Sequence, residues 1–114
     1  MKLYSALIVA GILCYSFTFG LSAQAGAGNA ANGKKLYAAQ CAMCHGVSGK
    51  GDGPAGKMLK PPARDFTKGV FKYGSTDAAI AKLIKTGKSP MPGFASLNAQ
   101  QLSDLVAYIR KLKK

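Results

Sequence analysis

The chain has 114 residues, enough for one small domain, and its 16 basic residues against four acidic ones give a formal net charge of +12 at pH 7. No nucleic-acid-binding motif accompanies the lysines, so the charge favours encounter with an acidic partner rather than a nucleic acid, and it makes the association rate depend on salt. An anionic membrane surface and a basic surface that is merely solvated are the competing interpretations.

The first 25 residues carry the pattern of a secretory signal peptide. Lys2 precedes an uncharged run over residues 3–21, and Ala23-Gln24-Ala25 supplies the small-x-small pattern of a cleavage site. We therefore expect a signal peptide at residues 1–25 and a mature domain at residues 26–114. Retention as a membrane anchor is one alternative, since the uncharged run approaches the length of a membrane span. Cys14 raises a lipoprotein signal as another, but Leu13 is larger than the residue expected before a lipoprotein cysteine.

The mature domain opens with a predicted helix. Asn29 can cap this helix, which is expected to run through about Gln40. Gly33, Tyr37 and Cys41 are four residues apart and therefore share one face of it. We expect Tyr37 to pack in the core.

Cys41-Ala42-Met43-Cys44-His45 has the pattern of an attachment site for c-type haem. Two cysteines at this spacing can each form a thioether to one macrocycle, and the histidine that follows lies beneath the iron. A thiol–disulfide pair is an alternative, but that motif is expected beside a βαβ pattern, which is not seen here. A structural zinc site normally needs four nitrogen or sulfur ligands, and the only further cysteine is Cys14. Chance occurrence of so short a motif is the third alternative.

A glycine-rich loop and an extended linker follow the motif. Residues 46–56 contain five glycines and Pro54, but they lack the preceding strand and the lysine–serine ending of a phosphate-binding loop. Residues 61–66 begin with two prolines, which favour extended backbone. Arg64 is either a partner for a haem propionate or an ordinary exposed arginine. Core or haem-wall positions are expected for the aromatic residues Phe66, Phe71 and Tyr73.

Two more helices are predicted. A short one begins after Ser75 or Thr76 as its cap and ends at Gly87. Its inward stripe consists of Ile80, Leu83 and Ile84. The last helix begins at Asn98, with Gln101 as the partner in a capping box. Its apolar stripe consists of Leu102, Leu105, Val106, Ile109 and Leu112.

The loop between these two helices, Ser89-Pro90-Met91-Pro92-Gly93-Phe94, is predicted to hold a second iron ligand. A thioether sulfur is a soft ligand suited to haem iron. Of the four methionines, Met1 falls in the signal peptide and Met43 in the attachment loop. Met58 follows His45 too closely to reach the other face of the iron, so we expect it to fill a gap in the core. Met91 is therefore the predicted ligand.

From about Ala30 to Lys114 the chain resembles a small class I cytochrome c of the bacterial periplasmic type. The resemblance rests on the cysteine–histidine motif, on Gly53-Pro54-Ala55, on residues 89–94 and on residues 105–109. It implies an all-α cytochrome c fold, in which three to four short helices wrap around one covalently bound haem and the terminal helices cross. It further implies that Gly33 lets the last helix approach closely, with Tyr37 and Tyr108 packed at the crossing. A backbone carbonyl at Pro54 would accept a hydrogen bond from the ring of His45.

The function that follows is electron carriage rather than enzymatic catalysis. Cys41 and Cys44 would bind haem c covalently, and His45 and Met91 would ligate its iron, leaving no open position for a substrate. The expected partners are redox proteins with acidic docking surfaces. The protein is expected to act as a monomer in the periplasm. It would contact the membrane only if residues 1–25 are retained as an anchor. A haem enzyme or gas sensor with a labile sixth ligand is the alternative. Because the domain is small, we expect the apoprotein to be largely unfolded.

Overall fold

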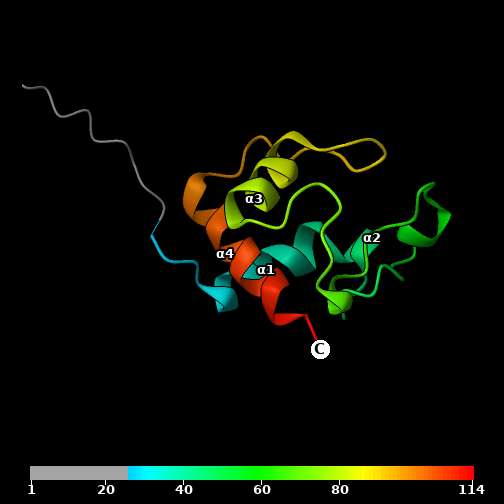
Figure 1. Cartoon of the computed structure of the whole chain (residues 1–114), viewed down its shortest axis with the longest axis horizontal. Coiled ribbons are helices and arrows are strands. Elements are labelled where there is room, and N and C mark those ends of the chain that lie inside the picture. Colours follow the sequence, from blue (N-terminus) through cyan, green and yellow to red (C-terminus); the bar gives the residue numbers. More distant parts are fainter. Residues whose placement is uncertain (1–25) are drawn as a thin grey trace, which may run out of the picture.

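The computed structural model describes residues 26–114, which form four α-helices and two short 3-10 helices (Figure 1). The α-helices are α1 (Ala30–Gln40), α2 (Ala42–His45), α3 (Asp77–Thr86) and α4 (Ala99–Lys111), and the 3-10 helices are η1 (Gly56–Met58) and η2 (Phe66–Lys68). Within residues 26–114 the only strand-like pairing is an isolated bridge between Lys88 and Met91, so the expected all-α fold is confirmed. The predicted signal peptide and Cys14 lie outside the described residues.

The helix starts follow from side-chain caps that the sequence predicts. Asn29 accepts hydrogen bonds from the backbone N–H groups of the first turn of α1, and Thr76 does the same for α3. Asn98 and Gln101 form the complete capping box of α4, with both reciprocal hydrogen bonds present. None of the helices in residues 26–114 combines the length and the apolar character that crossing a bilayer requires.

The two terminal helices cross at a glycine. α1 and α4 make the most extensive contact between helices, and Figure 1 shows them together at the centre of the fold. Gly33 lies so close to α4 that a Cβ atom built on it would be 1.9 Å from the carbonyl oxygen of Asp104. One turn later the rings of Tyr37 and Tyr108 pack edge to face, with centroids 5.1 Å apart. The expected crossing is therefore confirmed.

Asp104 ties the start of α1 to α4. Its buried carboxylate accepts hydrogen bonds from the backbone N–H of Asn29 at 2.7 Å and from the side chain of Gln100 at 2.9 Å. These hydrogen bonds, the one from Asn29 most of all, hold the pKa of Asp104 below its usual value. Gln100 also accepts from the backbone N–H of Gly26, so the first described residues run along α4.

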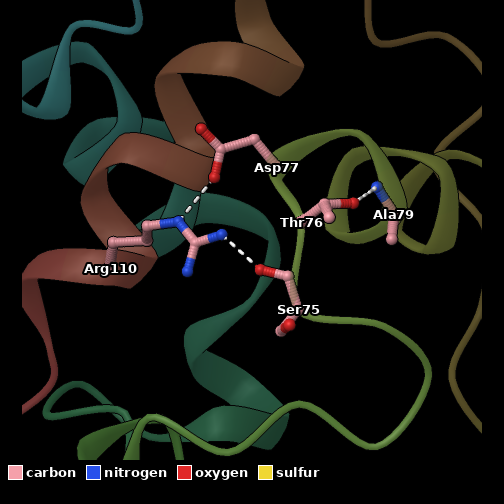
Figure 2. A network of polar contacts seen from close by, with 5 residues as sticks. All are labelled: Ser75, Thr76, Asp77, Ala79 and Arg110. Carbon is pink, nitrogen blue, oxygen red and sulfur yellow. Dashed lines mark hydrogen bonds and ion pairs between the residues drawn. The ribbon is translucent and has the colours of Figure 1, made fainter.

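A second junction joins the end of α4 to the loop before α3 (Figure 2). The guanidinium of Arg110 donates to the carboxylate of Asp77 and to the backbone carbonyl of Ser75. The same group lies 5.6 Å from the centroid of the Phe71 ring, within range of a cation–π interaction. Arg110 thus holds both ends of the segment from residue 71 to residue 77, which forms part of the wall of the cavity described next.

Candidate haem site

The cysteine–histidine motif forms a single helical turn that directs its three reactive side chains into one cavity. Cys41 ends α1 and begins α2, and its carbonyl accepts from the backbone N–H groups of Cys44 at 3.2 Å and His45 at 2.9 Å. Residues three and four apart in a helical turn lie on the same side. Accordingly, Cys41, Cys44 and His45 all line the same cavity.

The other walls of this cavity come from two distant parts of the chain. Residues 59–74 form one wall and residues 80–94 form another, with Ile109 of α4 behind them. The expected haem-wall aromatics Phe66, Phe71 and Tyr73 all line it, as does the stripe Ile80, Leu83 and Ile84 of α3. An apolar cavity with a few convergent polar groups is the usual form of a cofactor site.

Met91 reaches the cavity from a closely held loop. Met91 and Lys88 exchange two backbone hydrogen bonds, at 2.8 and 3.0 Å, which close a tight turn. Beyond the turn, the backbone N–H of Phe94 donates to the carbonyl of Ile84 at 2.9 Å and ties the loop to α3. Of the methionines within residues 26–114, Met91 alone lines the cavity.

The expectation that Met58 fills a gap in the core is wrong. Its side chain is 83% exposed, and it does not line the cavity. It lies at the end of η1, where the buried residue is Gly56, packed against the carbonyl of Cys44. The glycine is thus the inward residue of this short turn, and the methionine faces solvent.

The hydrogen-bond acceptor for the His45 ring also differs from the expectation. Nδ1 of His45 lies 3.1 Å from the backbone carbonyl of Arg64, whereas Pro54 was expected to provide it. The loop around Pro54 instead packs on the backbone of α2, where the N–H of Ala55 donates to the carbonyl of Met43 at 3.1 Å. A carbonyl carries no side-chain signature, so the composition of the linker gives no direct signal for this role.

Burial lowers the pKa of His45, with the hydrogen bond to Arg64 acting in the opposite direction. The imidazole is therefore favoured in its neutral form, which is the form that binds a metal ion. With Nδ1 occupied by a backbone carbonyl, Nε2 remains to act as the ligand atom.

The charged residues that line the cavity are all basic: Arg64, Lys72 and Lys88. The Nζ atoms of the two lysines lie 5.4 and 5.3 Å from the centroid of the Tyr73 ring. The one salt bridge among residues 26–114 joins Arg110 to Asp77, so neither lysine is paired with an acid there. An apolar cavity with cations along its lining fits haem, whose flat macrocycle is apolar and carries two carboxylates. Arg64 is a candidate for those carboxylates from the sequence alone, whereas no sequence feature singles out the two lysines.

The alternatives for the cysteine pair fit the structure less well. Burial, followed by the neighbouring Cys44, raises the pKa of the Cys41 thiol to about 11, whereas thiol–disulfide chemistry depends on a readily formed thiolate. Both cysteines are free, and the fold around them has no βαβ unit within the described part of the chain. Residues 26–114 also contain no cluster of three histidine, cysteine or acidic side chains suited to zinc.

Comparisons with known proteins point the same way as this geometry. The family model described as cytochrome c matches residues 30–113. Cytochrome c6 of Nostoc sp. is 38% identical over 112 residues, covering 96% of this chain and 92% of the relative. Cytochrome c-554(547) of Halothiobacillus neapolitanus is 37% identical over 92 residues, covering 76% of this chain and all of the relative. The solved structure of the KustC0563 c-type cytochrome superposes with a TM-score of 0.62 at 32% identity, over 72% of this chain and 98% of the other.

Proposed function

The chain belongs to the cytochrome c family and carries electrons through a covalently bound haem c, and we propose that Cys41, Cys44, His45 and Met91 hold this haem. In this assignment the two cysteines would hold the macrocycle through thioethers, and His45 and Met91 would serve as the iron ligands. The observation that carries the proposal is that all four side chains line one apolar cavity although Met91 comes from a distant loop.

When bound, haem supplies a redox centre that takes up and releases one electron. The protein residues hold this centre in one coordination state. Neutral His45 is oriented by the carbonyl of Arg64, and Met91 is held by the tight turn with Lys88. Histidine–methionine ligation raises the reduction potential relative to other axial pairs. If His45 and Met91 both serve as iron ligands, the protein would leave no iron position for a substrate, which supports a carrier without enzymatic activity.

The partner proposed for this carrier is a redox protein with an acidic docking surface. Support comes from the formal net charge of +12 and from the basic residues Arg64, Lys72 and Lys88 along the cavity lining. Such a field speeds the encounter with an acidic partner at low salt, and the advantage falls as salt screens the charges. A monomer is sufficient for this role.

We further propose that the protein is exported to the periplasm, with residues 1–25 as the signal peptide. The contacts of Gly26 and Ala27 with Gln100 support a mature domain that begins near the predicted cleavage site. N-terminal sequencing of the exported protein is expected to begin at Gly26. A chain that starts at Met1 would instead indicate a retained membrane anchor.

Carbon monoxide binding tests the assignment of a carrier. Reduced holoprotein at neutral pH is expected not to bind carbon monoxide, because Met91 would hold the iron position that the gas needs. The optical spectrum should therefore be the same with and without the gas. Rapid formation of a carbon monoxide complex by the unmodified protein would overturn the proposal and favour a gas sensor or a haem enzyme.

A further inference from the structure

We propose that Phe66 is a positioning residue that fixes the rotation of the His45 ring about its bond to the haem iron. This inference rests on the proposed role of His45 as an iron ligand. The observation behind it is a stacked contact: the ring centroids of Phe66 and His45 are 4.4 Å apart, and the ring planes differ by only 19°.

The stacking supplies a restraint that the hydrogen bond of His45 lacks. The carbonyl of Arg64, 3.1 Å from Nδ1, determines where that nitrogen points. A single hydrogen bond has a broad angular preference, so it leaves the ring free to turn over a considerable range. A flat ring lying parallel to the imidazole blocks this turning, because rotation would drive an edge of the imidazole into the face of Phe66. Both restraints come from the same short segment, residues 64–66.

Phe66 can restrain the His45 ring only if its own side chain is held in place, and its contacts indicate that it is. Its side chain is 9% exposed, and its backbone N–H donates to the carbonyl of Gly49 at 2.7 Å. The carboxylate of Asp65 caps η2 by accepting from the backbone N–H and the hydroxyl of Thr67, at 2.9 and 2.6 Å.

Two further aromatic rings pack against the Phe66 ring. Phe71 stacks on it with centroids 6.1 Å apart and planes 25° apart. Tyr37 meets it nearly edge to face, with centroids 6.4 Å apart and planes 64° apart. Since Phe71 also lies under the guanidinium of Arg110, the aromatic row from Phe71 to His45 is anchored at its far end to α4.

The rotation of an axial imidazole matters because its π system overlaps with particular d orbitals of the iron. The orientation of the ring plane therefore contributes to the magnetic anisotropy of oxidised low-spin haem. A ring held in one orientation also needs less rearrangement when the iron changes oxidation state. Residues that orient a ligand in this way tune a metal centre without touching the metal.

The test compares holoproteins carrying Phe66→Leu, Phe66→Tyr and Val106→Ala. Leucine at position 66 keeps an apolar side chain but removes the flat ring, whereas tyrosine keeps the ring. Val106→Ala is the control for a general loss of packing, because Val106 is buried in the core but does not line the cavity. The readouts are the electron paramagnetic resonance g values and the NMR shifts of the haem methyl groups in the oxidised protein, with the unfolding midpoint measured in parallel.

We expect Phe66→Leu to change the g values and the order of the methyl shifts, and Phe66→Tyr to retain the wild-type pattern. Val106→Ala should lower the unfolding midpoint while leaving the spectra near those of the wild type. Equal spectral changes in Phe66→Leu and Val106→Ala, or wild-type spectra in Phe66→Leu, would assign Phe66 to core packing alone. If Phe66→Leu does not fold, Phe66→Met removes the same flat ring and is judged by the same spectra. Failure of the proposed ligation is distinguishable, because it would already show in the wild-type protein as the absence of a low-spin histidine–methionine spectrum.

Discussion

Replacing Gly33 with alanine should separate the two terminal helices. The added Cβ would lie 1.9 Å from the carbonyl oxygen of Asp104, 2.5 Å from its carbonyl carbon and 2.9 Å from Cβ of Tyr108. Ordinary contact begins at 3.4 Å, so the nearest atoms have to move apart by about 1.5 Å. The two nearest obstacles are backbone atoms, which cannot rotate out of the way as a side chain can.

The expected cost is the balance of three effects. Overpacking at a closely packed contact costs about 1–3 kcal/mol. Moving α4 away also weakens the partly buried hydrogen bond between the N–H of Asn29 and the carboxylate of Asp104, worth about 1–3 kcal/mol. In the opposite direction, the greater helix propensity of alanine raises the unfolding free energy by up to about 1 kcal/mol. We therefore expect Gly33→Ala to lose about 1–5 kcal/mol of unfolding free energy, which at its upper end is a large part of the stability of a small domain.

Guanidinium chloride unfolding of the oxidised holoprotein, followed by haem absorbance and far-UV circular dichroism, measures this loss. Ala38→Gly, at an exposed position of the same helix, is the control for helix propensity and should cost only about 0.5–1 kcal/mol. A Gly33→Ala protein as stable as the wild type would refute the reasoning. It would mean that the helices do not cross closely at this residue.

Three further predictions follow from other contacts. Because hydrogen bonds lower the pKa of Asp104, its stabilisation is present above the usual carboxyl pKa of about 4 and is lost as the pH falls through the lowered value. Asp104→Ala should thus cost about 1–3 kcal/mol at pH 7 and progressively less in acid unfolding curves. The double variant Lys72→Gln, Lys88→Gln should lower the reduction potential, because it removes positive charge from the cavity lining. The control variant Lys34→Gln, Lys35→Gln removes the same charge from exposed positions on α1 and should lower the potential less. Equal shifts in potentiometry would refute a special role for the cavity lysines. Replacing both Cys41 and Cys44 with serine should leave a largely unfolded apoprotein, which retention of native helicity in far-UV circular dichroism would contradict.

The elements that could be predicted from the sequence are those encoded by side chains near one another in the chain. Asn29 and the capping box of Asn98 with Gln101 define helix starts through contacts over a few residues. The crossing at Gly33 was expected from the resemblance to class I cytochromes c, and the structure places Gly33 against α4 as that resemblance implies. The Met91 loop was identified by chemistry and by exclusion, since few side chains suit haem iron.

The features that could not be predicted are contacts between residues far apart in the sequence, which depend on the path of the loops between them. The carbonyl that meets His45 belongs to Arg64 rather than Pro54, and every residue at a suitable place, proline included, offers an equivalent backbone carbonyl. The stacking of Phe66 on His45 depends on the path of an extended linker without periodicity. Met58 has an apolar side chain of the kind found in cores, yet it is exposed, because it lies on a 3-10 turn whose buried residue is Gly56.

The identity of the sixth iron ligand is the most direct test of this account. Met91→Ala and Met58→Ala holoproteins are compared by the weak long-wavelength absorption of the methionine–iron bond in the oxidised state and by potentiometry. Met91→Ala is expected to lose that absorption, to show a markedly lower reduction potential and to bind carbon monoxide when reduced. Met58→Ala should match the wild type in all three respects. Loss of the absorption in Met58→Ala, with its retention in Met91→Ala, would contradict the proposed haem site.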